Sequence, residues 1–231
     1  MISGEPGAAA ADVARFQSEV AIPRALATGK FSRAAAFENL RPDEQRFPRK
    51  IDDFSHLTVY EIQNEDVAGA AVEANGLPAG APGVRVTNRL VYRRYPRASQ
   101  GRLTGRPTRG VFLILISPTE RNLAQTLRDW ADFVHIHYIA AATPPGYTVI
   151  TPYESVDGRD PLYLHFYELD TDDPVAAVEG MTPAVCRYRG FEMGDEAFLR
   201  WAFTDSLDIW YVNVFRRLPP SPVPLPEGRG V

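Results

Sequence analysis

The sequence contains one α/β pattern twice, and this repeat limits the possible folds more than any other feature. The clearest match pairs HLTVYEIQNEDVAGAAVEA, which begins at His56, with YLHFYELDTDDPVAAVEGM, which begins at Tyr163. Each segment alternates as a strand does, passes through acidic residues and continues as an alanine-rich helix. Asp66 and Asp173 place an acidic residue at the start of that helix in each copy, where the helix dipole favours negative charge.

The match extends in both directions from this segment. Upstream, FSRAAAFEN and YTVITPYES each predict a strand that follows a glycine and a long helical segment. Downstream, TNRLVYRRYPR corresponds to LDIWYVNVFRRL, and both predict a final aromatic-rich strand. The second copy begins with GVFLILIS, an apolar run typical of a strand buried on both faces, whereas the first copy retains only Met1 to Ser3 before a turn. Each copy therefore predicts the β-α-β-β-α-β order of a ferredoxin-like unit.

The predicted fold class is α+β, with two ferredoxin-like repeats whose antiparallel sheets pack face to face. Helices on one side of each sheet leave the other side bare, and stacking the two bare faces buries both. The first repeat is predicted over residues 1–97, with a truncated first strand, and a linker over 98–110. The second repeat is predicted over 111–218, with a helical insertion near 182–205, and a proline-rich tail over 219–231.

Composition and charge exclude several classes of partner. The formal net charge of −4 argues against a nucleic-acid partner, which would favour a basic excess. No apolar run approaches the ~20 residues that span a bilayer, so no membrane partner is expected. The single cysteine, Cys186, forms no disulfide within the chain, and the N-terminus lacks the features of a secretory signal. We expect a cytoplasmic protein, either a monomer or a homodimer.

The segment RDWADFVHIHYIAAATPPGYTVITPYE resembles the dimeric α/β-barrel superfamily, in particular its EthD-like branch. In that branch the first helix carries a Trp, a His five residues later and a Pro-Gly turn, which Trp130, His135 and Pro145-Gly146 match. The first copy has Phe16 and Ala21 at the two side-chain positions, so its motif is lost.

The resemblance implies a pocket between the helices and the sheet. Members of the superfamily include cofactor-free monooxygenases, polyketide cyclases and dehydratases, muconolactone isomerases and haem-binding enzymes. The resemblance therefore implies a small hydrophobic ligand, aromatic or polyketide-like, and it does not select one reaction.

The candidate catalytic residues lie on the first helix of the second copy. His135 ranks first, because its motif position matches and histidine transfers protons near neutral pH. Asp132, three residues earlier, is placed to orient the ring, although an Asp-His pair at this spacing is often only a surface pair. His137 is the alternative, because a regular helix with its apolar stripe at Leu127 and Trp130 points His137 toward the sheet. A core histidine without a catalytic role is the other interpretation of His137.

Neighbouring strands supply candidate substrate-binding residues. Along LYLHFYEL, period-two alternation places Tyr163, His165 and Tyr167 on one face, which suits either a ligand pocket or packing in the interior. The full set of substrate-binding candidates is Trp130, Tyr138, Tyr163, His165, Tyr153 and Asn213.

The preferred hypothesis is a cofactor-independent enzyme of the lyase, isomerase, cyclase or oxygenase type. His135 would be its general acid or base, assisted by Asp132, and its ligand a small hydrophobic organic molecule. The alternatives are a non-catalytic binding or accessory protein, and a haem protein with His135 or His137 as the axial ligand. No protein-bound metal site is predicted, because two histidines that are two residues apart on a helix face away from each other.

Overall fold

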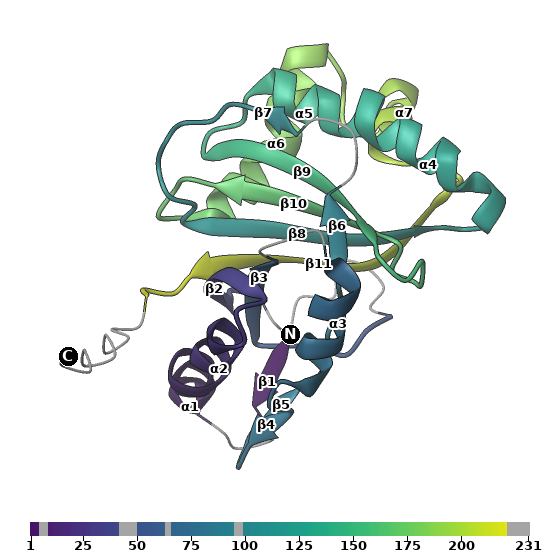
Figure 1. Ribbon diagram of the computed structural model, residues 1–231. Coiled ribbons are helices and arrows are strands. Elements are labelled where there is room, and N and C mark those ends of the chain that lie inside the picture. Colours follow the sequence, from purple (N-terminus) through teal and green to yellow (C-terminus); the bar gives the residue numbers. More distant parts are fainter. Residues whose placement is uncertain (5–8, 42–49, 63–65, 95–98, 221–231) are drawn as a thin grey trace, which may run out of the picture. The chain divides into compact units, whose positions relative to one another are not determined.

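The computed structural model describes residues 1–4, 9–41, 50–62, 66–94 and 99–220 (Figure 1). These residues form two compact units. Unit 1 comprises the described residues of 1–38, 52–89 and 217–220, and unit 2 comprises those of 39–51 and 90–216.

The sheet of unit 2 is antiparallel and is built around an almost fully buried strand. The apolar run predicted to open the second copy forms this strand, β8 (Gly110–Pro118), which pairs with β10 on one side and β11 on the other. The order of the main strands is β11-β8-β10-β9. The other three strands are β9 (Tyr147–Ser155), β10 (Tyr163–Leu169) and β11 (Leu207–Arg217).

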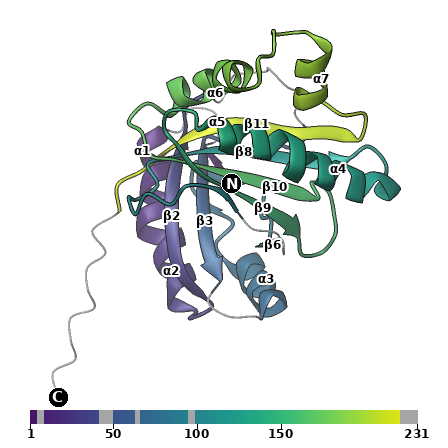
Figure 2. The same ribbon diagram turned by 90° about the horizontal axis from the view of Figure 1, so that it is seen from above.

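Helices cover one side of this sheet, as Figures 1 and 2 show. Beyond a short 3₁₀ turn (Arg121–Leu123), the first helix comprises α4 (Ala124–Trp130), a π-helical segment (Ala131–His135) and α5 (Ile136–Ala142). The other helices are α6 (Pro174–Arg189) and α7 (Glu196–Ala202); α7 lies in the segment predicted as a helical insertion. Their apolar faces and the sheet enclose a core that includes Ile136, Ile139, Tyr167 and Val185.

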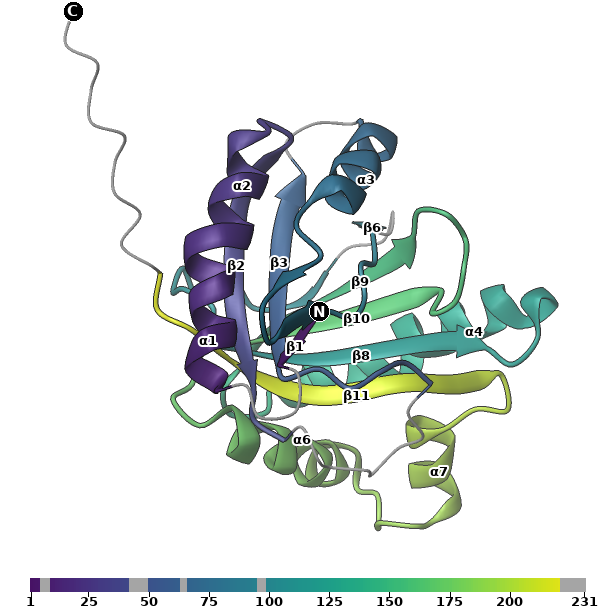
Figure 3. The same cartoon turned by 90° about the horizontal axis from the view of Figure 1, so that it is seen from below.

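Unit 1 contains the same kinds of elements in a smaller sheet. Its strand order is β4-β5-β1-β3-β2, and every neighbouring pair is antiparallel. Figure 3 shows its helices beside strands β2 and β3. The strands are β1 (Ile2–Gly4), β2 (Phe31–Asn39), β3 (His56–Ile62), β4 (Gly80–Ala81) and β5 (Val84–Val86). The helical elements are α1 (Ala10–Arg15), a π-helical segment (Phe16–Ala21), α2 (Ile22–Ala27) and α3 (Val67–Gly76).

The prediction that TNRLVYRRYPR forms the last strand of the first copy is wrong. The last strand of unit 1 is β5, which pairs with β1 through Ile2 and Val86. The described part of the predicted strand contributes only β6 (Tyr92–Arg94), which lies beside β9 in unit 2, as does β7 (Gln100–Gly101). The exposed arginines of β6 suit an edge strand, where charge protects the unpaired backbone.

The α+β class with antiparallel sheets is confirmed. Face-to-face packing of the sheets and the predicted domain boundaries remain predictions, and residues 221–231 of the predicted tail lie outside the described residues. Within the described segments, no helix has both the length and the apolar character needed to cross a membrane.

Helix α6 depends on an N-terminal cap. The Asp173 side chain accepts a hydrogen bond from the backbone N–H of Ala176 at 3.0 Å. We expect Asp173→Ala to lower the free energy of unfolding by about 1 kcal/mol, because that N–H loses its partner. The neighbouring Asp172→Ala, which removes only an exposed ion pair with Arg109, should change it by less than about 0.5 kcal/mol. Urea unfolding of both variants measures the difference, and equal losses would contradict the capping role.

Candidate functional site

Several of the predicted site residues meet at one small cavity within unit 2. The cavity lies between the first helix and strands β9 and β10, and its volume of about 10 Å³ holds roughly one water molecule. Its polar lining consists of Arg128, Asp132, Tyr153, Tyr163 and His165. Its apolar lining consists of Ile116, Leu127, Ala131 and Pro152.

Asp132 reaches this cavity from the π-helical segment of the first helix. Its relative exposure is only 4%. The side-chain amide of Gln100 on β7 donates a hydrogen bond to the backbone carbonyl of Asp132 at 2.7 Å. Strand β7 therefore helps to fix the position of the Asp132 backbone.

His165 reaches the cavity from the middle of β10, and 5% of its surface is exposed. Burial, together with the smaller effect of the nearby His135, lowers the pKa of His165 to about 3. The ring is therefore neutral at pH 7. Among the described residues, neither of its ring nitrogens has a hydrogen-bond partner. A neutral imidazole of this kind donates one hydrogen bond and accepts another.

His135 makes a different set of contacts. Its ring stacks between two indoles, with centroid distances of 5.0 Å to Trp130 and 5.3 Å to Trp201. Its Nδ1 lies 3.1 Å from the carbonyl oxygen of Trp201, and the Trp201 indole N–H donates to the carbonyl of His135 at 3.2 Å. Burial lowers the pKa of His135 to about 4, so the neutral ring donates its Nδ1 proton to Trp201. These contacts attach α7 to the first helix, and His135 is not among the residues that line the cavity.

His137 is exposed, and the prediction that it faces the sheet is wrong. A π-helical turn contains an extra residue, so it rotates the following residues by about 100° relative to a regular helix. Ile136 and Ile139 consequently face the core in place of His137. The interpretation of His137 as a core histidine fails for the same reason.

Arg128 belongs to the site but was not a sequence-based candidate. Its Nη2 donates to Glu154 at 3.1 Å and to the Tyr163 hydroxyl at 3.2 Å, and its guanidinium lies 5.3 Å from the centre of the Tyr163 ring. Burial raises the pKa of Tyr163, and the charge of Arg128 opposes that rise. The signal in the sequence was the spacing of Arg128 and Asp132, which are four residues apart and so share one face of a helix.

The remaining candidates lie elsewhere in unit 2. Tyr138 packs against Phe191, and the Arg189 guanidinium lies 4.2 Å from the centre of its ring. Asn213 is buried on β11, where its amide donates to the carbonyl of Arg41 at 2.8 Å. Trp130 donates its indole N–H to the carbonyl of Arg200 at 3.0 Å. Of the substrate-binding candidates, therefore, Tyr153, Tyr163 and His165 line the cavity, and the other three do not.

His135 as arranged does not fit the role of an axial haem ligand. His135 lies between two indoles and donates its Nδ1 proton to a carbonyl, and the cavity beside it has room for about one water molecule. Within the segments that the structure describes, no three side chains of His, Cys, Asp or Glu gather as a metal site would require.

No family model and no curated protein matches the sequence. Among solved structures, the chain is similar to a candidate monooxygenase from Lactobacillus acidophilus NCFM. The sequence identity is 13%, the match covers 87% of this chain and 83% of that chain, and the TM-score is 0.39. A similarity at this level assigns no function.

The neutral histidines predict a loss of stability in acid. The folded-state pKa values of His165 and His135, about 3 and about 4, lie below the ordinary value of 6.5, so below pH 6.5 the unfolded chain binds more protons than the folded chain. Stability is therefore complete above pH 6.5 and falls as the pH drops toward 4. Each histidine contributes up to about 1.4 kcal/mol per pH unit to this fall.

His165→Gln should flatten this dependence, because the variant has one fewer buried histidine to protonate. The exposed His137→Gln should keep the wild-type dependence. Urea unfolding at pH 7, 6 and 5 measures all three slopes. If His165→Gln and His137→Gln lost stability equally steeply, the assignment of a buried neutral ring to His165 would be wrong.

Proposed function

We propose that unit 2 is a cofactor-independent enzyme that transfers a proton on a small hydrophobic molecule bearing a carbonyl or phenol group. The observation that carries this proposal is that Asp132 and His165, from different elements, line one buried cavity. Burying a carboxylate and an imidazole at the same place costs free energy, and a site that uses both accounts for their meeting.

The two side chains suit complementary roles. The Asp132 carboxylate is the general base, which takes a proton from a carbon next to a carbonyl group. The electron pair of the broken C–H bond forms a C=C bond, and the π pair of the carbonyl group moves to its oxygen. The neutral His165 ring donates a hydrogen bond to that oxygen, as neutral imidazoles can when their pKa is lowered. Both interactions gain strength because the site excludes bulk water.

The cavity dimensions support a particular substrate class. The cavity has space for about one water molecule, which suits a single oxygen atom of the substrate. The aromatic and aliphatic side chains around it favour an apolar molecule. Enolisation of this kind can begin lyase, isomerase, cyclase and cofactor-free oxygenase reactions, so the proposal stops at the proton transfer.

We interpret the two units as copies of one ancestor, of which only unit 2 retains the site. The alignment of the copies pairs Gln17 with Ala131 and Thr58 with His165. In unit 1, Gln17 is fully buried, and its amide donates to the Thr58 hydroxyl at 2.9 Å. A glutamine side chain therefore fills the position where Ala131 leaves space in unit 2, which supports a site in unit 2 alone.

Proton exchange tests the proposed function even while the final product is unidentified. The protein is incubated in D₂O with a panel of small cyclic ketones, aryl ketones and phenols, and deuterium incorporation is followed by NMR. We expect catalysed exchange with at least one member, and we expect Asp132→Asn to slow it by ~10²–10⁴-fold. His165→Gln should also slow it, because the enolate oxygen loses its hydrogen-bond donor.

The matched control is His137→Gln, which removes an exposed histidine from the same unit and should leave exchange unchanged. Binding of a panel member with no catalysed exchange would favour the alternative of a non-catalytic binding protein. Exchange that survives both Asp132→Asn and His165→Gln would place the chemistry elsewhere.

The role of Ala131 gives a separate test. Ala131→Gln should abolish exchange while the protein stays folded, because the longer side chain fills the cavity as Gln17 does in unit 1. Thr126→Gln, at an exposed position of α4, introduces the same side chain away from the cavity and should keep full activity. Circular dichroism and urea unfolding show whether both variants are folded. Full activity of a folded Ala131→Gln variant would contradict a reaction in this cavity.

A further inference from the structure

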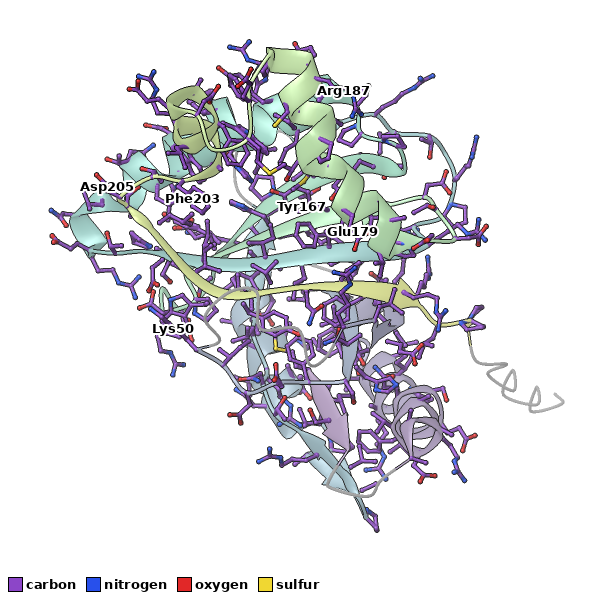
Figure 4. The ribbon with its side chains drawn as sticks, turned by 180° about the vertical axis from the view of Figure 1, so that it is seen from behind. Lys50, Tyr167, Glu179, Arg187, Phe203 and Asp205 are labelled. Atoms are coloured by element: carbon purple, nitrogen blue, oxygen red, sulfur yellow. The ribbon has the colours of Figure 1, made fainter. Side chains whose placement is uncertain are left out.

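Two buried tyrosine hydroxyls in unit 2 have no hydrogen-bond partner among the described residues. They belong to Tyr147, at the start of β9, and Tyr167, on β10. Tyr167 has a relative exposure of 0%, and Figure 4 places it between the sheet and α6. Tyr147 packs against the same core, and its hydroxyl is buried although part of the residue is exposed.

The two rings are neighbours. Their centroids lie 6.1 Å apart with an interplanar angle of 87°. The hydroxyls do not bond to each other, because neither has a partner within hydrogen-bond distance. Burial raises the pKa of each tyrosine well above its ordinary value, and Tyr167 adds to the rise at Tyr147. Both hydroxyls therefore keep their protons, and each can donate as well as accept a hydrogen bond.

A buried hydroxyl without a partner loses its hydration and gains nothing in return. Native cores rarely contain such groups, and two of them side by side are less expected still. Buried water molecules satisfy groups of this kind, and each water forms two to four hydrogen bonds.

We propose that unit 2 binds one internal water molecule that bridges the hydroxyls of Tyr147 and Tyr167. The chemical requirement is a guest small enough for the core that both donates and accepts hydrogen bonds, and water meets it. Tyr167 lies two residues from His165 on the same face of β10, so this water lies on the side of the sheet that carries the cavity. The site does not depend on the proposed enzymatic function.

Two nearly isosteric substitutions test the proposal by whether they lower or raise the folding equilibrium constant. If a water bridges the hydroxyls, Tyr147→Phe and Tyr167→Phe each remove one of its partners. Each should then lower the folding equilibrium constant by about fivefold, the value of one hydrogen bond. The double variant should lose little more than either single variant, because the bridge is already broken. Urea unfolding gives the four equilibrium constants of this cycle.

Two further tyrosines calibrate the measurement. Tyr92→Phe removes a hydroxyl that donates directly to the carbonyl of Pro161 at 2.9 Å, and it shows the size of one lost hydrogen bond in this unit. Tyr188→Phe changes a residue that is 53% exposed and should have no effect.

If no water molecule bridges the two hydroxyls, the substitutions should have the opposite effect on the folding equilibrium constant. The single variants would then leave the folding constant unchanged or raise it, because a hydroxyl that gains nothing from burial is removed. Either finding overturns the proposal. Losses that multiply in the double variant also overturn it, because they indicate two separate partners.

Discussion

The π-helical segment at Ala131–His135 determines which side chains of the first helix of unit 2 face its core. In a regular helix, the direction of one side chain fixes the directions of all the others, and the apolar side chains form one stripe. The extra residue of the π turn rotates α5 against α4, so Ile136 and Ile139 face the core while His137 is exposed. His135 is left between two indoles, where it holds α7. The corresponding helix of unit 1 has a π-helical segment at Phe16–Ala21, and there Gln17 lies against β3. The direction in which each polar side chain leaves the helix, more than its residue type, decides whether it lines the cavity.

The main strands of unit 2 were predictable from local sequence, because alternation depends only on neighbouring residues. Tyr163, His165 and Tyr167 share one buried face as their spacing predicts, and GVFLILIS forms the buried strand β8. The residues of the first helix that face the core could not be predicted in the same way, because a π turn leaves no periodic signal in a single sequence. The contacts of Trp201 with His135 join residues that are far apart in the chain, and no local pattern contains them. Arg93 and Arg94 look like the end of a repeat, but their strand pairs with β9.

The two units treat polar side chains in the core differently. In unit 1, the Gln17 amide and the Thr58 hydroxyl bind each other, so polarity there supports packing. In unit 2, Asp132 and His165 line a space the size of a water molecule. Burying polar side chains costs free energy, and natural proteins accept that cost mainly where a site needs it. Gln17 therefore fills its surroundings in unit 1, whereas unit 2 keeps a small cavity beside Ala131.

The division of the chain into units has a consequence for synthesis on the ribosome. Unit 1 includes residue 218, whose backbone N–H donates to the carbonyl of Ala36, and unit 2 includes residues 40 and 50, which bond to Val214 and Trp210 on β11. Each unit therefore contains segments that are far apart in the sequence. Neither unit can complete these backbone hydrogen bonds on the ribosome until residues 210–218 have emerged. A stop codon before residue 210 would leave both units incomplete, and no single cut yields two whole units.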